Sequence, residues 1–253
     1  MTLDLHPSVA HATDDVVALY EDTSVLAVYK PCGQVTHPTY RNLEGTLAQA
    51  VFARQAARGE ERPCLLHRLD RDTSGVVLFA KTEQARRELV RQFERRQILK
   101  RYLAVTHGIP EPAAGTITFP LTRDPLDRRR VIASPEGKLS ETGYRTLAVG
   151  PRAALLEARP RTGRTHQIRA HLATLGHPLL GDRVYSDADR EGESTSRLML
   201  HAWRLTVRLP GLDEPLTLEA PVPEEFLITL RAECPAGADA IMLTARVGHE
   251  EDQ

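Results

Sequence analysis

The amino-acid sequence predicts one α/β domain, in which strands alternate with a few helices. Short β-prone segments and helical patterns follow one another along the chain, and no internal repeat or low-complexity linker separates them. A chain of 253 residues, of which 41% are hydrophobic, is long enough to bury a substantial core. We expect an extension over residues 1–15, the domain over residues 16–235 and a tail over residues 236–253.

The first part of the domain predicts a hairpin, a helix and a buried strand, in that order. Residues 16–20 and 25–29 are β-prone and flank the polar residues 21–24, which is typical of a β-hairpin. The segment Leu47–Ala57 favours a helix. The continuous apolar run at residues 76–80 predicts a buried strand.

The rest of the chain predicts three more helices with strands between them. An amphipathic helix is expected at residues 83–96, because Ala85, Leu89 and Phe93 recur at four-residue spacing. The alternation around Tyr102 predicts a strand directly after that helix. The remaining expected elements are strands at residues 154–158, 198–209 and 216–219, and helices at residues 165–175 and 223–233.

Composition argues against a membrane protein, a disulfide-rich protein and a zinc protein. No run approaches the ~18 apolar residues of a membrane span, and the N-terminus has no signal-peptide pattern, so we expect a cytoplasmic location. The three cysteines are far apart and form no Cys-x-x-Cys pair, so we expect reduced thiols; they are Cys32, Cys64 and Cys234. The expected oligomeric state is a monomer.

Charge is distributed unevenly along the chain, although the net charge is only -1. Acidic residues gather after residue 210, so the preceding part of the chain is net positive. Basic residues are dense at 86–101 and, as four arginines, at 159–171. Such stripes supply the attraction to phosphate that RNA binding needs. A solvated helix face with a few ion pairs is an equally open explanation for residues 86–96.

The densest group of chemically able residues is the run His-Arg-Leu-Asp-Arg-Asp-Thr-Ser-Gly at residues 67–75. Apolar residues at 64–66 and 76–80 flank this run, so we expect its polar groups in or beside the core. A carboxylate held near a cation in an apolar setting is a typical nucleophile or general base, which makes Asp70 the candidate catalytic residue. The same residue types also form tight turns, and the run by itself leaves that alternative open.

The expected helix at residues 165–175 carries a candidate partner for this carboxylate. Thr165 is the expected N-cap, and Gly176 lies just beyond the helix end. At about 100° per residue, Arg169 falls on the flank of the apolar face of the helix. Its stem can therefore be buried while its guanidinium reaches a carboxylate at the edge of the core, which suits Asp70.

The run at residues 67–75 resembles the signature of the RluA-type RNA pseudouridine synthases. Four further segments occur in the order that this family shows, at residues 29–38, 100–104, 161–171 and 198–202. One short match is weak evidence, but five in the right order cover most of the chain. The resemblance implies the pseudouridine synthase fold, an α/β (α+β) fold whose mixed, largely antiparallel sheet has a central cleft flanked by helices.

The resemblance also implies roles for individual residues. Asp70 matches the catalytic carboxylate, Tyr102 matches a tyrosine that packs on the uracil, and Arg169 matches an arginine that pairs with the catalytic Asp. Residues 121–130 resemble a hairpin that grips RNA in many family members. The residues expected to bind the substrate are Arg68, Leu200, Arg164, His166 and Arg129.

The implied reaction is isomerisation of specific uridines to pseudouridine in structured RNA, without a cofactor or metal. The carboxylate can attack the anomeric carbon or remove a proton from the neighbouring carbon, and the sequence does not choose between these routes. The base must leave the RNA stack to reach a buried carboxylate. No S4 domain is expected before residue 16, so a tRNA loop and an rRNA stem-loop both stay open as substrates.

Two other classes of function stay open at this point. The chain could be an RNA-binding module that keeps the fold without turnover. It could also be a metal-dependent hydrolase that uses some of its ten histidines, although no His-x-x-x-His motif supports this.

Overall fold

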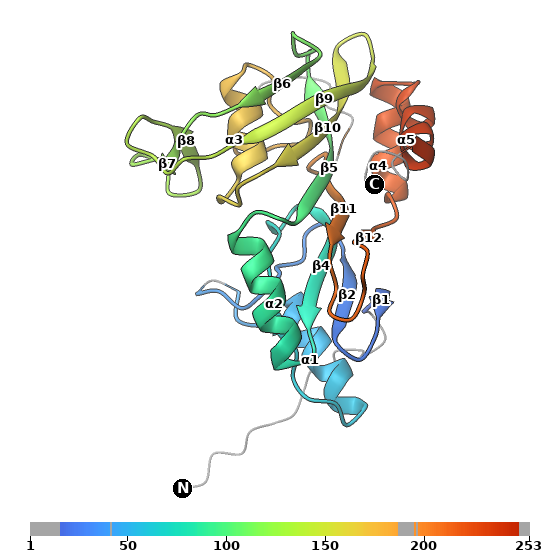
Figure 1. The fold of residues 1–253 in the computed structure, drawn as a ribbon. Helices are drawn as coiled ribbons and strands as arrows, with labels where there is room; N and C mark the ends of the chain where they lie inside the picture. Colours follow the sequence, from blue (N-terminus) through green and yellow to red (C-terminus); the bar gives the residue numbers. More distant parts are fainter. Residues whose placement is uncertain (1–15, 41, 187–194, 196, 248–253) are drawn as a thin grey trace, which may run out of the picture.

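The computed structural model describes residues 16–40, 42–186, 195 and 197–247 (Figure 1). The expected extension at residues 1–15 and the end of the expected tail at residues 248–253 lie outside these ranges. None of the helices in the described part of the chain has the length and apolar character needed to cross a membrane.

One large sheet runs through the molecule. In the described residues it has ten strands, in the order β1-β2-β4-β11-β5-β10-β9-β6, with β3 beside β4 and β12 beside β11. Every pair of neighbouring strands is antiparallel except β4 and β11, which confirms a mixed, largely antiparallel sheet. The strands are β1 (Ala18–Glu21), β2 (Val25–Lys30), β3 (Cys64–Leu65), β4 (Ser74–Ala80), β5 (Leu99–His107), β6 (Ala114–Ile117), β9 (Thr142–Val149), β10 (Ala153–Pro160), β11 (Leu200–Val207) and β12 (Leu216–Glu219).

The sheet has two halves, each with its own helices, as Figure 1 shows. The lower half contains β1, β2 and β4 with α1 (Leu47–Ala57) and α2 (Glu83–Glu94). The upper half contains β6, β9 and β10 with α3 (Gln167–Thr174), α4 (Glu224–Glu233) and α5 (Gly237–Val247). A separate hairpin of β7 (Leu121–Arg123) and β8 (Val131–Ala133) projects from the upper half.

The parallel pair β4 and β11 joins the two halves. Ser74 lies opposite His201 and Gly75 opposite Ala202, so β4 enters the sheet only four residues after Asp70. Gly75 has a φ of +130°, and a Cβ at this position would collide with the carbonyl group of Ala202. Only glycine therefore allows this close approach, which places the loop before β4 at the junction of the halves.

The apolar run of β4 is buried because helices cover both faces of the lower half. Val76 and Leu78 belong to the same core cluster as Leu89 of α2. Val77 and Phe79 point to the opposite face and pack with α1. Side chains that alternate between two covered faces must all be apolar, which explains the continuous pattern in the sequence.

The helix that carries Arg169 begins one residue later than expected. Its N-cap is His166, in the left-handed conformation with a φ of +51°, and not Thr165. The side chain of Gln167 accepts hydrogen bonds from the backbone of Arg164 and the hydroxyl of Thr162. These contacts turn the chain at His166 and leave Thr165 without a capping role.

The expected tail is also corrected in part. Residues 237–247, expected to belong to it, form the helix α5. Ile241 of α5 lies in a buried cluster with Phe226 and Leu230 of α4. This packing holds α5 against the upper half. The helix begins at the last residue of the sequence Pro-Ala-Gly at residues 235–237, which is typical of a loop.

Candidate active site

A cavity of about 350 Å³ lies where the two halves of the sheet meet. The loop before β4, the start of β5, the loop between β10 and α3, and the start of β11 form its walls. Phe93 of α2 contributes from the lower half. The residues that line it are His67, Arg68, Leu69, Asp70, Thr73, Phe93, Lys100, Tyr102, Pro160, Thr162, Gly163, Arg164, Thr165, His166, Gln167, Ile168, Arg169 and Leu200.

Buried hydrogen bonds hold the loop that carries Asp70. The Thr36 hydroxyl donates to the carbonyl of Leu69 at 2.8 Å and accepts from its amide at 3.2 Å. On the other side of Asp70, the fully buried Lys30 Nζ donates to the carbonyl of Arg71 at 2.8 Å. The backbone is therefore fixed on both sides of the candidate catalytic residue.

The ammonium group of Lys30 is surrounded by backbone carbonyl groups that accept its hydrogen bonds. Its Nζ also donates to the carbonyls of Pro31 and Gln34, at 2.8 and 2.7 Å. Burial lowers the pKa of Lys30 to about 8, and the nearby Cys32 and Asp72 oppose this shift. Three carbonyl acceptors match the three protons of an ammonium group, so the side chain joins two loops that are distant in the sequence.

The Asp70 carboxylate faces two cationic or polar side chains of the upper half. Its side chain is 22% exposed, which leaves one edge open to the cavity. Oδ2 lies 3.9 Å from Nη1 of Arg169 and 4.0 Å from Nε2 of His166. The predicted pairing of Arg169 with Asp70 is thus present as a near contact rather than a direct hydrogen bond.

Arg169 makes its direct hydrogen bonds with Asp182, which sequence reasoning missed. Nε and Nη2 each donate to one carboxylate oxygen at 2.7 Å, and both side chains are buried. Burial opposes the charge of Arg169, but the hydrogen bonds and charge of Asp182 raise its pKa. The pair holds the guanidinium in position beside Asp70. The only sequence signal for Asp182 was an acid following the apolar residues Leu179 and Leu180.

Tyr102 and Leu200 form adjacent parts of the cavity wall, on the neighbouring strands β5 and β11. Burial and, to a smaller extent, the charge of Asp70 raise the pKa of Tyr102 well above its ordinary value. The phenol therefore keeps its proton at neutral pH and can donate a hydrogen bond. Leu200 supplies the apolar surface against which a planar base can pack.

His166 faces Asp70 from the start of α3. Burial lowers its pKa, with Asp70 opposing the shift and Arg169 adding to it. Its Nδ1 lies 3.3 Å from the hydroxyl of Tyr185, another residue that the sequence did not single out. A neutral histidine can present either a proton or a lone pair to Asp70, depending on its tautomer.

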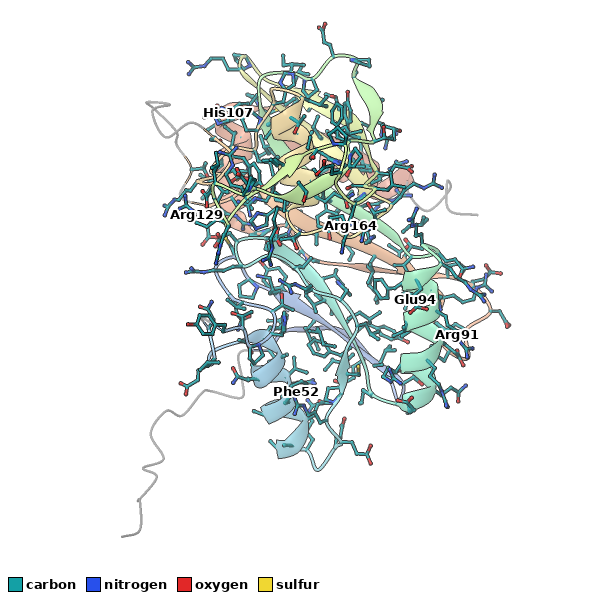
Figure 2. All side chains as sticks on the ribbon, turned by 90° about the vertical axis from the view of Figure 1, so that its left-hand side faces the viewer. Phe52, Arg91, Glu94, His107, Arg129 and Arg164 are labelled. Atoms are coloured by element: carbon teal, nitrogen blue, oxygen red, sulfur yellow. The ribbon has the colours of Figure 1, made fainter. Side chains whose placement is uncertain are left out.

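The three arginines expected to bind substrate occupy different positions. Arg68 and Arg164 are exposed and line the cavity. Arg164 donates to the carbonyl of Leu139, at 3.3 Å from both Nε and Nη2, and Figure 2 shows it near the middle of the molecule. Arg129 lies between β7 and β8, outside the cavity lining, at the edge of the upper half in Figure 2.

Lys100 adds a cation that was not among the predicted site residues. It lines the cavity, and its Nζ donates to the carbonyl of Thr162 at 3.3 Å. Burial and, less strongly, Arg96 lower its pKa to about 8.

The described residues contain no group of three His, Cys, Asp or Glu side chains placed to hold a metal ion.

The chain is similar in sequence to known RNA pseudouridine synthases. A model of the family described as RNA pseudouridylate synthase matches residues 24–174. A Chloroflexus aurantiacus protein named "uncharacterized RNA pseudouridine synthase" is 44% identical over 205 residues, covering 80% of this chain and 64% of that protein. The ribosomal large subunit pseudouridine synthase D of Nitrosomonas europaea is 36% identical, covering 85% of this chain and 64% of the relative. The chain thus spans less than two thirds of the length of these two relatives.

A solved structure resembles the fold over a similar range. The human protein called RNA pseudouridylate synthase domain containing 4 superposes with a TM-score of 0.71 at 27% identity. The match covers 85% of this chain and 92% of that chain. Together with the sequence matches over most of the domain, this shows that the chain belongs to the RNA pseudouridylate synthase family.

Proposed function

We propose that the protein converts specific uridines in structured RNA to pseudouridine, with Asp70 as the catalytic carboxylate and no cofactor. The observation that carries this proposal is the position of Asp70, with one edge open to a cavity and Arg169 3.9 Å away. A carboxylate in this position can serve either as a nucleophile or as a base.

The reaction exchanges one bond to the sugar for another within the same nucleotide. The bond between the anomeric carbon and N1 of uracil breaks, the base turns, and the same carbon bonds to C5. C5 loses a proton and N1 gains one, so the product is an isomer of the substrate. The positive charge of Arg169 attracts and orients the Asp70 carboxylate, and Tyr102 packs on the base and assists proton transfer.

RNA binding in this proposal uses the basic rim of the cavity. Arg68, Arg164 and His166 contact the nucleotides beside the target, and Leu200 packs against the flipped uracil. Arg129 contacts a more distant phosphate from the β7–β8 hairpin. We expect the substrate to be an rRNA or tRNA stem-loop, since one relative is named for the large ribosomal subunit. We also propose that the protein acts as a monomer in the cytoplasm.

The test is tritium release from RNA transcripts labelled at C5 of uracil, with wild type and Asp70→Asn compared side by side. Wild type should release tritium, and Asp70→Asn should release it at least about a thousandfold more slowly. The variant should bind the same RNA with unchanged affinity, because the substitution keeps the size of the side chain.

Three outcomes separate this function from the alternatives. Binding by wild type without release from tRNA or rRNA would favour an RNA-binding module. Loss of activity in a chelator would favour a metal-dependent enzyme. Full activity of Asp70→Asn would remove Asp70 from the mechanism.

A further inference from the structure

Tyr185 connects the β7–β8 hairpin to the active site. Its hydroxyl accepts a hydrogen bond from the amide of Val131, the first residue of β8, at 2.8 Å. The same oxygen lies 3.2 Å from the carbonyl of Val131 and 3.3 Å from Nδ1 of His166. One phenol therefore touches both the loop end of the hairpin, where Val131 pairs with Arg123, and a histidine that faces Asp70.

The hydroxyl has a single proton, so it can donate to only one of these two acceptors. If it donates to Nδ1 of His166, the ring proton of this neutral histidine is on Nε2. That nitrogen then presents an N–H to Asp70, whose Oδ2 is 4.0 Å away. If Tyr185 donates to the carbonyl of Val131, His166 can carry its proton on Nδ1 and present a lone pair to Asp70 instead.

Asp182 and Arg169, the buried pair beside Asp70, also contact Tyr185. Asp182 accepts from the amide of Tyr185 at 3.2 Å while it binds Arg169. The guanidinium carbon of Arg169 lies 5.3 Å from the centre of the Tyr185 ring. The orientation of the phenol is thus tied to the buried pair that stands beside Asp70.

The β7–β8 hairpin also contacts the ring of Tyr185, through Arg130. The guanidinium carbon of Arg130 lies 5.5 Å from the ring centre of Tyr185. Its Nε is buried and has no hydrogen-bond partner within the described part of the chain. Arg130 is therefore turned toward Tyr185, whereas its neighbour Arg129 is exposed. A shift of the end of the hairpin would move both Arg130 and Val131 against the phenol.

The geometry points to Tyr185 as a positioning residue that selects the tautomer of His166 and couples it to the β7–β8 hairpin. RNA seated on the hairpin shifts Val131, directs the phenolic proton to His166 and places an N–H opposite Asp70. This inference rests on the proposed function, in which the hairpin holds the substrate. It adds a residue that acts through His166 and does not itself touch the uridine.

The test compares Tyr185→Phe with the matched control Tyr144→Phe. Tyr144 lies on β9, is buried, and donates its hydroxyl proton to the carbonyl of Pro112 at 3.1 Å. Both substitutions remove one hydroxyl that meets a backbone carbonyl. Only the first removes a contact with His166, so a general effect of losing a buried hydroxyl appears in both variants.

The first readout is the tautomer of His166, from nitrogen NMR of protein labelled with isotopic histidine. The resonance is assigned from its loss in His166→Gln. Tyr185→Phe should change the ratio of the two tautomers, and Tyr144→Phe should not. An unchanged ratio in Tyr185→Phe overturns the inference. This arm needs no turnover, so its result is independent of whether the protein modifies RNA.

The second readout is the effect of RNA on the same resonance. An rRNA transcript that the protein binds should shift the tautomer ratio in wild type and leave it unchanged in Tyr185→Phe. No shift in wild type overturns the coupling to the hairpin, even if Tyr185 still selects the tautomer in the free protein.

The third readout is the kinetics of pseudouridine formation. Tyr185→Phe should lower kcat roughly tenfold and change KM by less than about threefold, the size expected for one lost hydrogen bond. Adding Tyr185→Phe to His166→Gln should cause no further loss, because the phenol acts through the ring. A further loss in the double variant, or an effect on KM alone, contradicts the proposal.

Discussion

Two arginine–aspartate pairs in this protein have the same chemistry in opposite surroundings. Arg169 binds Asp182 at 2.7 Å, with side-chain exposures of 5% and 0%. Arg129 also binds Asp127 at 2.7 Å, but 71% of its side chain is exposed. The first pair lies beside Asp70, and the second lies on the β7–β8 hairpin.

The difference shows that burial, and not distance, decides what such a pair does. An exposed pair contributes ~0–1 kcal/mol, because water and salt screen it. Breaking a buried pair costs about 3–5 kcal/mol, because the remaining charge is left unpaired. The buried pair therefore fixes Arg169 beside Asp70. In the function proposed above, the exposed pair leaves Arg129 free to exchange Asp127 for an RNA phosphate.

The largest effect is expected from Asp182→Asn, which keeps the size of the side chain and removes its charge. We expect the free energy of unfolding to fall by about 3 kcal/mol, because Arg169 stays buried without its main partner. Urea denaturation measures this loss. The matched variant Asp127→Asn should leave the same quantity almost unchanged, because water and salt screen the exposed pair. Equal effects at the two sites would contradict the comparison.

A smaller effect is expected from Arg169→Lys, which keeps the charge and loses the planar fork. Lysine cannot make both hydrogen bonds to Asp182, so the free energy of unfolding should fall by about 1–3 kcal/mol. The rate of pseudouridine formation in a single turnover should fall at least about tenfold, since the cation beside Asp70 is displaced. RNA affinity, measured by filter binding, serves as the control and should stay within about twofold. A wild-type rate would show that the fork is not needed.

On the exposed side, Arg129→Ala should weaken RNA binding without altering the chemical step. The slope of log affinity against log salt concentration should decrease in magnitude by about 1, as expected for one lost phosphate contact. KM should rise while kcat is unchanged. Arg86→Ala is a useful comparison, because the side chain of Arg86 on α2 is 42% exposed and pairs with Glu83 at 2.6 Å. An equal change of slope there would extend the RNA surface to α2.

The smallest effect is the pH dependence of the exposed pair. Hydrogen bonds from Arg129 lower the pKa of Asp127 from 3.8 to about 2. A carboxyl group whose folded pKa is lowered adds stability above its unfolded pKa, and this stability is lost as the pH falls from about 3.8 to about 2. The small difference in unfolding free energy between wild type and Asp127→Asn should therefore shrink over this interval. Urea denaturation at a series of pH values measures this difference. A difference that grows as the pH falls would contradict the prediction.

Local patterns predicted much of the fold. The helix Leu47–Ala57 has the expected bounds, and the apolar run before residue 81 forms the buried strand β4. No pattern predicted α5, because its attachment depends on Ile241 packing against α4. The start of α3 was misplaced by one residue for a similar reason, since Gln167 binds Thr162 across the preceding loop.

The sequence predicted several residues of the candidate site but only some of the contacts between them. Asp70, Tyr102, Arg169 and Leu200 were singled out from motifs, and all of them line one cavity. The pairing of Arg169 was predicted from helix geometry, which gives the direction of a side chain but not which acid reaches it first. Asp182 comes from a segment beyond the helix and makes the direct hydrogen bonds.

By itself, the sequence determined the family, the candidate catalytic loop and most of the local elements, because each depends on a short run of neighbouring residues. Only the tertiary structure decided that Lys30 and Thr36 clamp the Asp70 loop, and that Tyr185 stands between the hairpin and His166. These contacts join segments that lie far apart in the chain. Their geometry exists only once the two halves of the sheet have paired through β4 and β11 and buried the polar groups between them.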